Sequence, residues 1–154
     1  MKKLASLVFI FLITFSAAAQ KIDMEFATMD EQLEYKVKYF MNWKTTQDPG
    51  YTYIAKKGLT YKTAVMEIKN VTNEDLKIDF SRIAILDKNN NKYQAHHAVQ
   101  SGKLIMSDKL TRNLGADNTR TFMVEFWPAF PKDEVPRLLI DDQVIELQVK
   151  EKKK

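Results

Sequence analysis

Alternation of apolar and polar residues is the feature that most restricts how this chain can fold. It is clearest over residues 33–43, where every second residue is apolar or aromatic and most of the others are charged or polar. Successive side chains of a β-strand point to opposite faces, so this pattern predicts a strand with one face on a core. The same alternation recurs over residues 64–68, 76–80, 83–85, 122–126, 138–140 and 145–149.

Turn-forming residues separate these stretches, most clearly at Pro49-Gly50, 70–73, 87–91 and 114–118. These segments are rich in Gly, Pro, Asn and Asp, which tolerate the backbone conformations of tight turns. No segment shows a convincing helical period. About seven short strands joined by turns predict an all-β fold, a single antiparallel immunoglobulin-like β-sandwich. Residues 96–113 lack a clean period and are interpreted as a long loop.

The N-terminus has the pattern of a cleavable export signal. Lys2 and Lys3 precede an apolar run over residues 4–15, and Ala17 and Ala19 occupy the −3 and −1 positions of a small-residue cleavage site. A membrane span needs about 20 apolar residues, so this run is short for one. We therefore expect residues 1–19 to be a signal peptide and the mature protein to be periplasmic or extracellular, without a membrane anchor. An uncleaved N-terminal anchor is the alternative.

The remaining residues are expected to form one domain. We divide them into a lead-in, first strand and loop (20–59), a sandwich body (60–149) and a basic tail (150–154). The chain has no cysteine, so disulfides, thiolate metal sites and cysteine nucleophiles are excluded. The net charge of +4 includes two lysines of the expected signal. The positive charges form no clustered stripe, which disfavours nucleic acid as a partner.

Several core and turn motifs resemble those of a known family. They are Tyr61-x-x-Ala-Val-Met-Glu-Ile-Lys-Asn70, Ile83-x-Ile-Leu-Asp87 followed by Tyr93, Leu114-Gly115, Thr121-Phe-Met-Val-Glu-Phe126 and Pro136-x-Leu-Leu-Ile140. Together they resemble the bacterial immunoprotective-extracellular-type Ig-like domains over residues 60–149. The resemblance implies a secreted or lipid-anchored β-sandwich, mostly of unknown function, and supplies no catalytic motif. The chain departs from the family at Lys92, where a glycine is usual, and in lacking the lipid-attachment cysteine.

His96 and His97 are the two histidines of the chain, and Met106 and Asp108 follow in the same unpatterned segment. Imidazole and thioether groups suit a copper-type site, so a periplasmic metal carrier using His96, His97 and Met106 is one hypothesis. Adjacent residues on an extended segment point to opposite faces, however. The two histidines can therefore serve one ion only if the backbone turns between them, and surface loop histidines are the favoured interpretation.

Other chemistry finds little support in the sequence. Asp87, Asn89 and Asn91 are spaced like the start of a calcium loop, but Lys92 and Ala98 stand where such a loop needs glycine and glutamate. A hairpin turn explains the cluster instead. The sequence has no G-x-S-x-G elbow, no H-E-x-x-H pair and no phosphate-binding glycine loop. We therefore predict a protein that is not an enzyme and uses no cofactor.

Aromatic side chains are stronger candidates for a functional surface than the metal, calcium or catalytic sites considered above. Phe40 lies on the otherwise polar face of the first strand, Tyr51 and Tyr53 follow a turn, and Trp127 and Phe130 lie in a proline-bounded loop. If exposed together, they would form an apolar patch for a protein or sugar partner. The alternative is that the loop aromatics plug one end of the sandwich. The sequence thus favours a non-catalytic interaction module whose partner is an envelope or extracellular protein or glycan. Its working surface would combine the 44–59, 96–113 and 127–131 loops.

Overall fold

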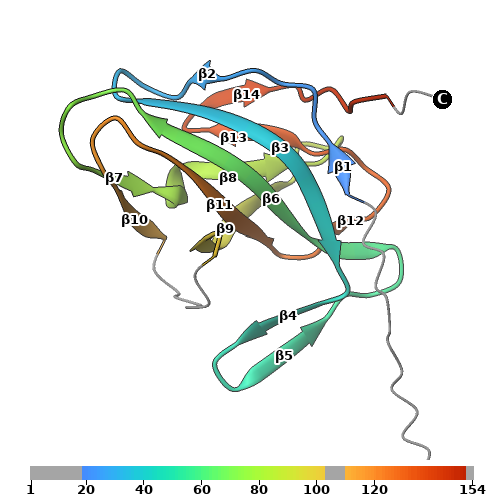
Figure 1. Ribbon diagram of the computed structural model, residues 1–154. Helices are drawn as coiled ribbons and strands as arrows, with labels where there is room; N and C mark the ends of the chain where they lie inside the picture. Colours follow the sequence, from blue (N-terminus) through green and yellow to red (C-terminus); the bar gives the residue numbers. More distant parts are fainter. Residues whose placement is uncertain (1–18, 103–109, 152–154) are drawn as a thin grey trace, which may run out of the picture.

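The structure is a computed structural model that describes residues 19–102 and 110–151 (Figure 1). Its strands are β1 (Gln20–Lys21), β2 (Ala27–Thr28), β3 (Leu33–Trp43), β4 (Thr45–Asp48), β5 (Tyr51–Ile54), β6 (Leu59–Asn70), β7 (Leu76–Asp79), β8 (Ile83–Leu86), β9 (Lys92–Gln100), β10 (Thr111–Leu114), β11 (Thr119–Trp127), β12 (Phe130–Pro131), β13 (Arg137–Ile140) and β14 (Gln143–Ile145). A single-turn 3-10 helix, Phe80–Arg82, separates β7 from β8. The described residues contain no helix long and apolar enough to cross a membrane.

One long antiparallel sheet makes most of the protein. Its strand order is β1-β3-β6-β11-β9-β8-β13-β14, with β2 beside β3 and β12 beside β6. Side chains from β3, β6 and β11 share one buried cluster with those from β8 and β13. The sheet thus folds over its own core as a sandwich, and the all-β antiparallel prediction is confirmed. The described residues contain more strand segments than the seven expected, because several are two-residue pairings at the edges of longer strands.

A β-bulge in β3 reverses which side chains face the core. Val37 pairs with Met66 and Tyr39 pairs with Val65, so Lys38 is an extra residue in the ladder. A one-residue shift exchanges the two faces of a strand. Val37 faces the core before the bulge. After the bulge, Phe40 occupies the core-facing position, whereas Tyr39 is only partly buried. The prediction of one continuous apolar face over residues 33–43 is wrong for this reason.

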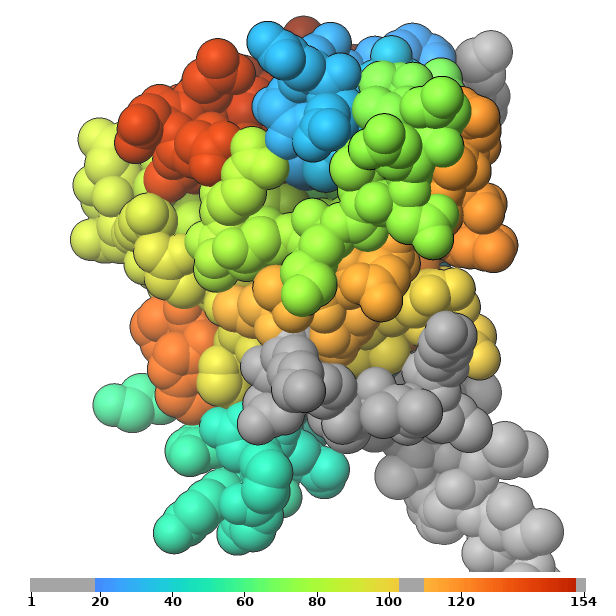
Figure 2. Space-filling model, turned by 90° about the vertical axis from the view of Figure 1, so that its left-hand side faces the viewer, coloured from blue at the N-terminus to red at the C-terminus, as the bar shows by residue number. Residues whose placement is uncertain are grey.

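The expected loops are more structured than their sequences indicate. β9 continues to Gln100 and β10 begins at Thr111, so the prediction of a loop over residues 96–113 is wrong at both ends. Between these two strands, residues 103–109 lie outside the described residues. Within the expected 44–59 loop, β4 and β5 pair as a hairpin around a turn where Gly50 has a positive φ of 84°. This hairpin stands out from one end of the sandwich (Figures 1 and 2).

Candidate metal-binding site under the β4–β5 hairpin

A second bulge, in β9, turns two adjacent histidines to the same side of the sheet. Glu125 of β11 pairs with His97, whereas the next residue of β11 pairs with Ala95, so His96 is the extra residue. Ala95 and Ala98 belong to the core, which leaves both histidines on the outer face. Their ring centroids are 4.1 Å apart. The expectation that adjacent histidines diverge is therefore wrong at this position, because the bulge supplies the turn of the backbone.

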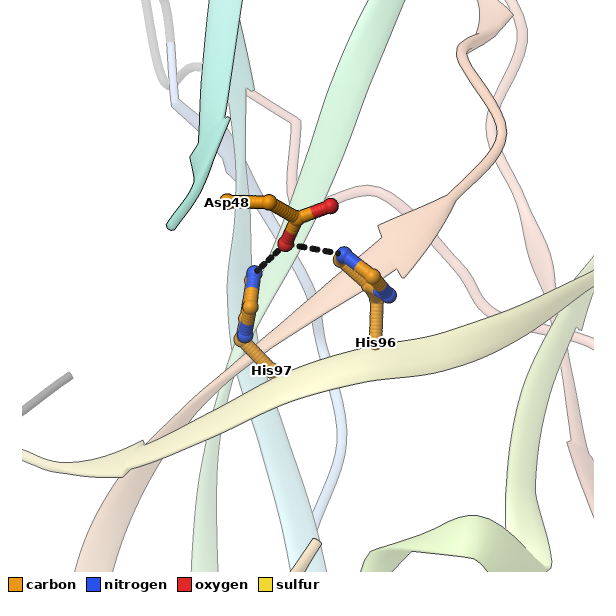
Figure 3. Close-up of side chains that lie close together, drawn as sticks. All are labelled: Asp48, His96 and His97. Carbon is orange, nitrogen blue, oxygen red and sulfur yellow. Dashed lines mark hydrogen bonds and ion pairs between the residues drawn. The ribbon is translucent and has the colours of Figure 1, made fainter. Parts of the chain in front are cut away.

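Asp48, at the end of β4, meets the two histidines from the opposite side (Figure 3). Its Oδ1 atom forms a hydrogen bond of 2.9 Å with Nε2 of His96 and lies 3.2 Å from Nε2 of His97. The hairpin is held in this position by a second polar contact, in which the Thr46 hydroxyl donates a hydrogen bond to Glu125. Residues far apart in the sequence thus bring one carboxylate and two imidazoles together.

The spacing of these donor atoms suits a shared ion. Protein nitrogen and oxygen ligands lie about 2.0–2.2 Å from zinc. Two such ligands are therefore roughly 3.0–3.5 Å apart when the angle between them is that of an octahedral or tetrahedral site. The Asp48–His97 distance of 3.2 Å falls within this range, and the Asp48–His96 distance of 2.9 Å falls just below it. All three donor atoms lie within 4.8 Å of one another.

The buried ring of His97 lacks a hydrogen-bond partner among the described residues. Only 9% of the residue is exposed, and neither of its ring nitrogens has a hydrogen-bond partner among the described residues. Its Nε2 lies close to Asp48 Oδ1 but without the directional geometry of a hydrogen bond. Leaving a buried polar group unpaired costs about 1–3 kcal/mol. An ion bound at Nε2 would remove this cost at that atom.

The walls of the site combine one acid and several aromatic rings. Burial raises the pKa of Glu125, and the hydrogen bond from Thr46 together with the two nearby histidines offsets part of this rise. The ring of Trp127 lies 5.5 Å from that of His96 and 4.8 Å from that of Tyr53. These side chains place the site between the outer face of the sheet and the hairpin.

The structure separates the predicted aromatic surface into buried and exposed parts. Phe40 and Phe130 are fully buried in the core, so the prediction that they contribute to an exposed patch is wrong. The bulge in β3 buries Phe40, and Phe130 packs edge-on against the Tyr93 ring at 4.8 Å. Tyr51 is 69% exposed.

Two further predicted residues, Tyr53 and Trp127, pack edge-on with ring centroids 4.8 Å apart, and Tyr51 stacks on Tyr53 at 6.3 Å. These three predicted aromatics therefore lie together, on β5 and the adjoining end of β11. Met106, the expected third metal ligand, lies outside the described residues. Asp48 takes that place and was missed by sequence reasoning, because its position before Pro49-Gly50 indicates only a turn. No signal in the sequence pairs it with histidines about fifty residues away.

Comparison with known proteins supports the fold. A scan against family models and a search of curated proteins find no match. Among solved structures, the chain is similar to an uncharacterized β-sandwich protein from Clostridium difficile 630. That match has a TM-score of 0.54 and 15% identity, over 82% of this chain and 91% of the other. A conserved hypothetical protein from Bacillus anthracis is similar with a TM-score of 0.53 and 14% identity, over 83% and 96% of the two chains.

Proposed function

We propose that this protein binds a divalent transition-metal ion through Asp48, His96 and His97. The observation that carries the proposal is the convergence of three ligand atoms around buried His97, whose ring nitrogens have no hydrogen-bond partner among the described residues. Imidazole ligands suit zinc, copper, iron and nickel, and the added carboxylate does not favour a soft ion such as Cu(I). The ligand set therefore differs from the copper-type His and Met site that the sequence suggests.

Titration calorimetry with Zn2+ and Cu2+ tests this function. We expect one ion per chain with micromolar affinity or tighter. His97→Gln and Asp48→Asn should each weaken binding by at least about 10-fold, which is the loss that even residues supporting the ligands produce. Gln94→Ala, an exposed change on β9, is the matched control and should bind like the wild type. Affinity no tighter than millimolar, or equal affinity in all variants, would refute the proposal.

Partner binding is a second candidate, favoured by the exposure of Tyr51 at the tip of the hairpin. We infer a non-catalytic interaction module of Ig-like type, exported to the periplasm or the cell exterior. Its partner would be an envelope or extracellular protein or glycan. A pull-down from the native envelope should recover a partner with the wild type and lose it with Tyr51→Ala. Equal recovery by both proteins would remove this surface from consideration.

A further inference from the structure

The β4–β5 hairpin is attached to the sandwich by side chains rather than by a backbone ladder. Within residues 19–102 and 110–151, its two strands pair with each other and with no strand of the long sheet. One backbone hydrogen bond of 2.9 Å closes its base, from the amide of Ala55 to the carbonyl of Lys44. Figure 2 shows the hairpin (teal) standing out from the body at one end. Its position over the outer face is thus not imposed by sheet pairing.

Among the described residues, contacts of Thr46, Tyr53 and Asp48 hold the hairpin against the sheet. Thr46 bonds to Glu125, Tyr53 packs against Trp127, and Asp48 meets the two histidines. The other large side chains of β5, Tyr51 and Ile54, are 69% and 67% exposed and add little burial. An isolated two-stranded hairpin is at best marginally stable in water. The docked position therefore depends on a few contacts, of which the metal site is one.

We propose that metal occupancy controls the docking of this hairpin over the sheet, an inference that rests on the proposed metal-binding function. Asp48 is the ligand that the hairpin supplies, whereas His96 and His97 belong to β9. All three ligands can hold one ion only when the hairpin is docked. A ligand that binds one conformation better than another shifts the population toward it. The bound ion acts as a staple, and loss of the ion increases the population in which the hairpin is undocked.

The size of the effect follows from linkage. A ligand shifts a two-state equilibrium by the ratio of its affinities for the two states. Without Asp48 the two histidines still hold zinc, at least about 10-fold more weakly, so saturating zinc should make undocking at least roughly 10-fold rarer. Backbone amides of residues 45–54 that exchange with solvent through undocking should then exchange at least roughly 10-fold more slowly.

Hydrogen–deuterium exchange of the full chain, with and without Zn2+, tests the proposal, and calorimetry on the same samples measures binding. In the wild type, zinc should slow exchange in residues 45–54 far more than in β3 and β6. Asp48→Ala keeps both histidines but cuts the link to the hairpin, so zinc should bind more weakly and leave the hairpin unprotected. Gln47→Ala changes the neighbouring exposed side chain and should behave like the wild type.

The outcomes separate this inference from the function on which it rests. Zinc binding without slower hairpin exchange would overturn the staple and leave the proposed function intact. Slowing of equal size in the hairpin and in β3 and β6 would also overturn it, since that pattern indicates global stabilisation. An absence of zinc binding in calorimetry would refute both. Protection confined to the hairpin, and lost in Asp48→Ala, would support the staple.

Discussion

Lys62 of β6 has no exposed surface, and its burial should make the stability of the protein depend on pH. Its Nζ atom donates hydrogen bonds to Oε1 of Gln20 at 3.0 Å and to the backbone carbonyl of Lys132 at 3.4 Å. Burial lowers the pKa of Lys62 from 10.5 to about 8, although Asp133 and Glu134 favour the charged amine. The folded state therefore holds this proton less tightly than the unfolded state does.

The sign of the pH effect follows from proton binding. Below about pH 8, both states are protonated at Lys62 and the fold bears the full cost of the buried charge. Between about pH 8 and 10.5 the unfolded state binds more protons, so the free energy of unfolding rises with pH. Each pH unit in that window is worth about 1.4 kcal/mol. From pH 8 to about 9.5, Lys62 should add up to about 2 kcal/mol of stability.

Tyrosines set the upper limit of this window. Burial raises the pKa of Tyr35, Tyr61 and Tyr93, and for Tyr93 the value reaches about 12. A raised tyrosine pKa contributes stability that is lost once the unfolded-state tyrosine ionises, near pH 10. Measurements should therefore stop at about pH 9.5, where only the lysine effect is large.

Urea unfolding of the wild type and of Lys62→Met, at several values between about pH 7 and 9.5, measures the effect. Methionine keeps an unbranched side chain of similar length but carries no titrating group. The wild type should gain stability over the window and Lys62→Met should lose most of that slope. Lys57→Met, at an exposed position between β5 and β6, should keep the wild-type slope. Equal slopes in the wild type and Lys62→Met would refute the reasoning.

Four further substitutions test the packing and the polar contacts of the fold. Phe40→Ala should lower the free energy of unfolding by about 3–5 kcal/mol because it empties a fully buried site, whereas Tyr51→Ala should change it by no more than about 0.5 kcal/mol. Similar urea midpoints for the two variants would contradict the assigned core. Burial alone would raise the pKa of Asp87, but hydrogen bonds from Asn91, Asn89 and Tyr93 lower it below 3.8. Its contribution should therefore be present above about pH 4 and be lost in more acid solution, and Asp87→Asn should flatten the acid side of a plot of Tm against pH. Arg82→Lys should cost about 1 kcal/mol at low salt, because lysine cannot make the paired contacts of Arg82 to the Asp141 carboxylate. That cost should shrink in high salt, and an equal cost at both salt concentrations would contradict an electrostatic origin.

Much of the fold could be predicted from local patterns alone. Alternation over residues 33–43 and 122–126 corresponds to β3 and β11, and the turn at 87–91 joins β8 to β9. These features depend on neighbouring residues, since strand alternation and turn chemistry are properties of short segments. Membership of the Ig-like family and the export signal stay predictions.

The candidate site was only half accessible to sequence reasoning. His96 and His97 were singled out as possible ligands, but the adjacency of the two residues argued against one shared ion. Asp48 was not considered, because nothing local distinguishes an aspartate in a ligand position from one in a turn. The pairing of these residues is a long-range contact, and one sequence carries no record of it.

The sequence by itself determined that this chain is an antiparallel β protein without cysteine, held together by core packing. Tertiary structure decided which face each side chain occupies beyond a bulge, and it placed Phe40 in the core and turned His96 and His97 to one side. The physical reason is that a bulge is a mismatch between two strands. Alternation within one strand does not reveal where its partner will lack a residue. The docking of the hairpin, which brings Asp48 to the histidines, is likewise a contact between segments that are distant in sequence.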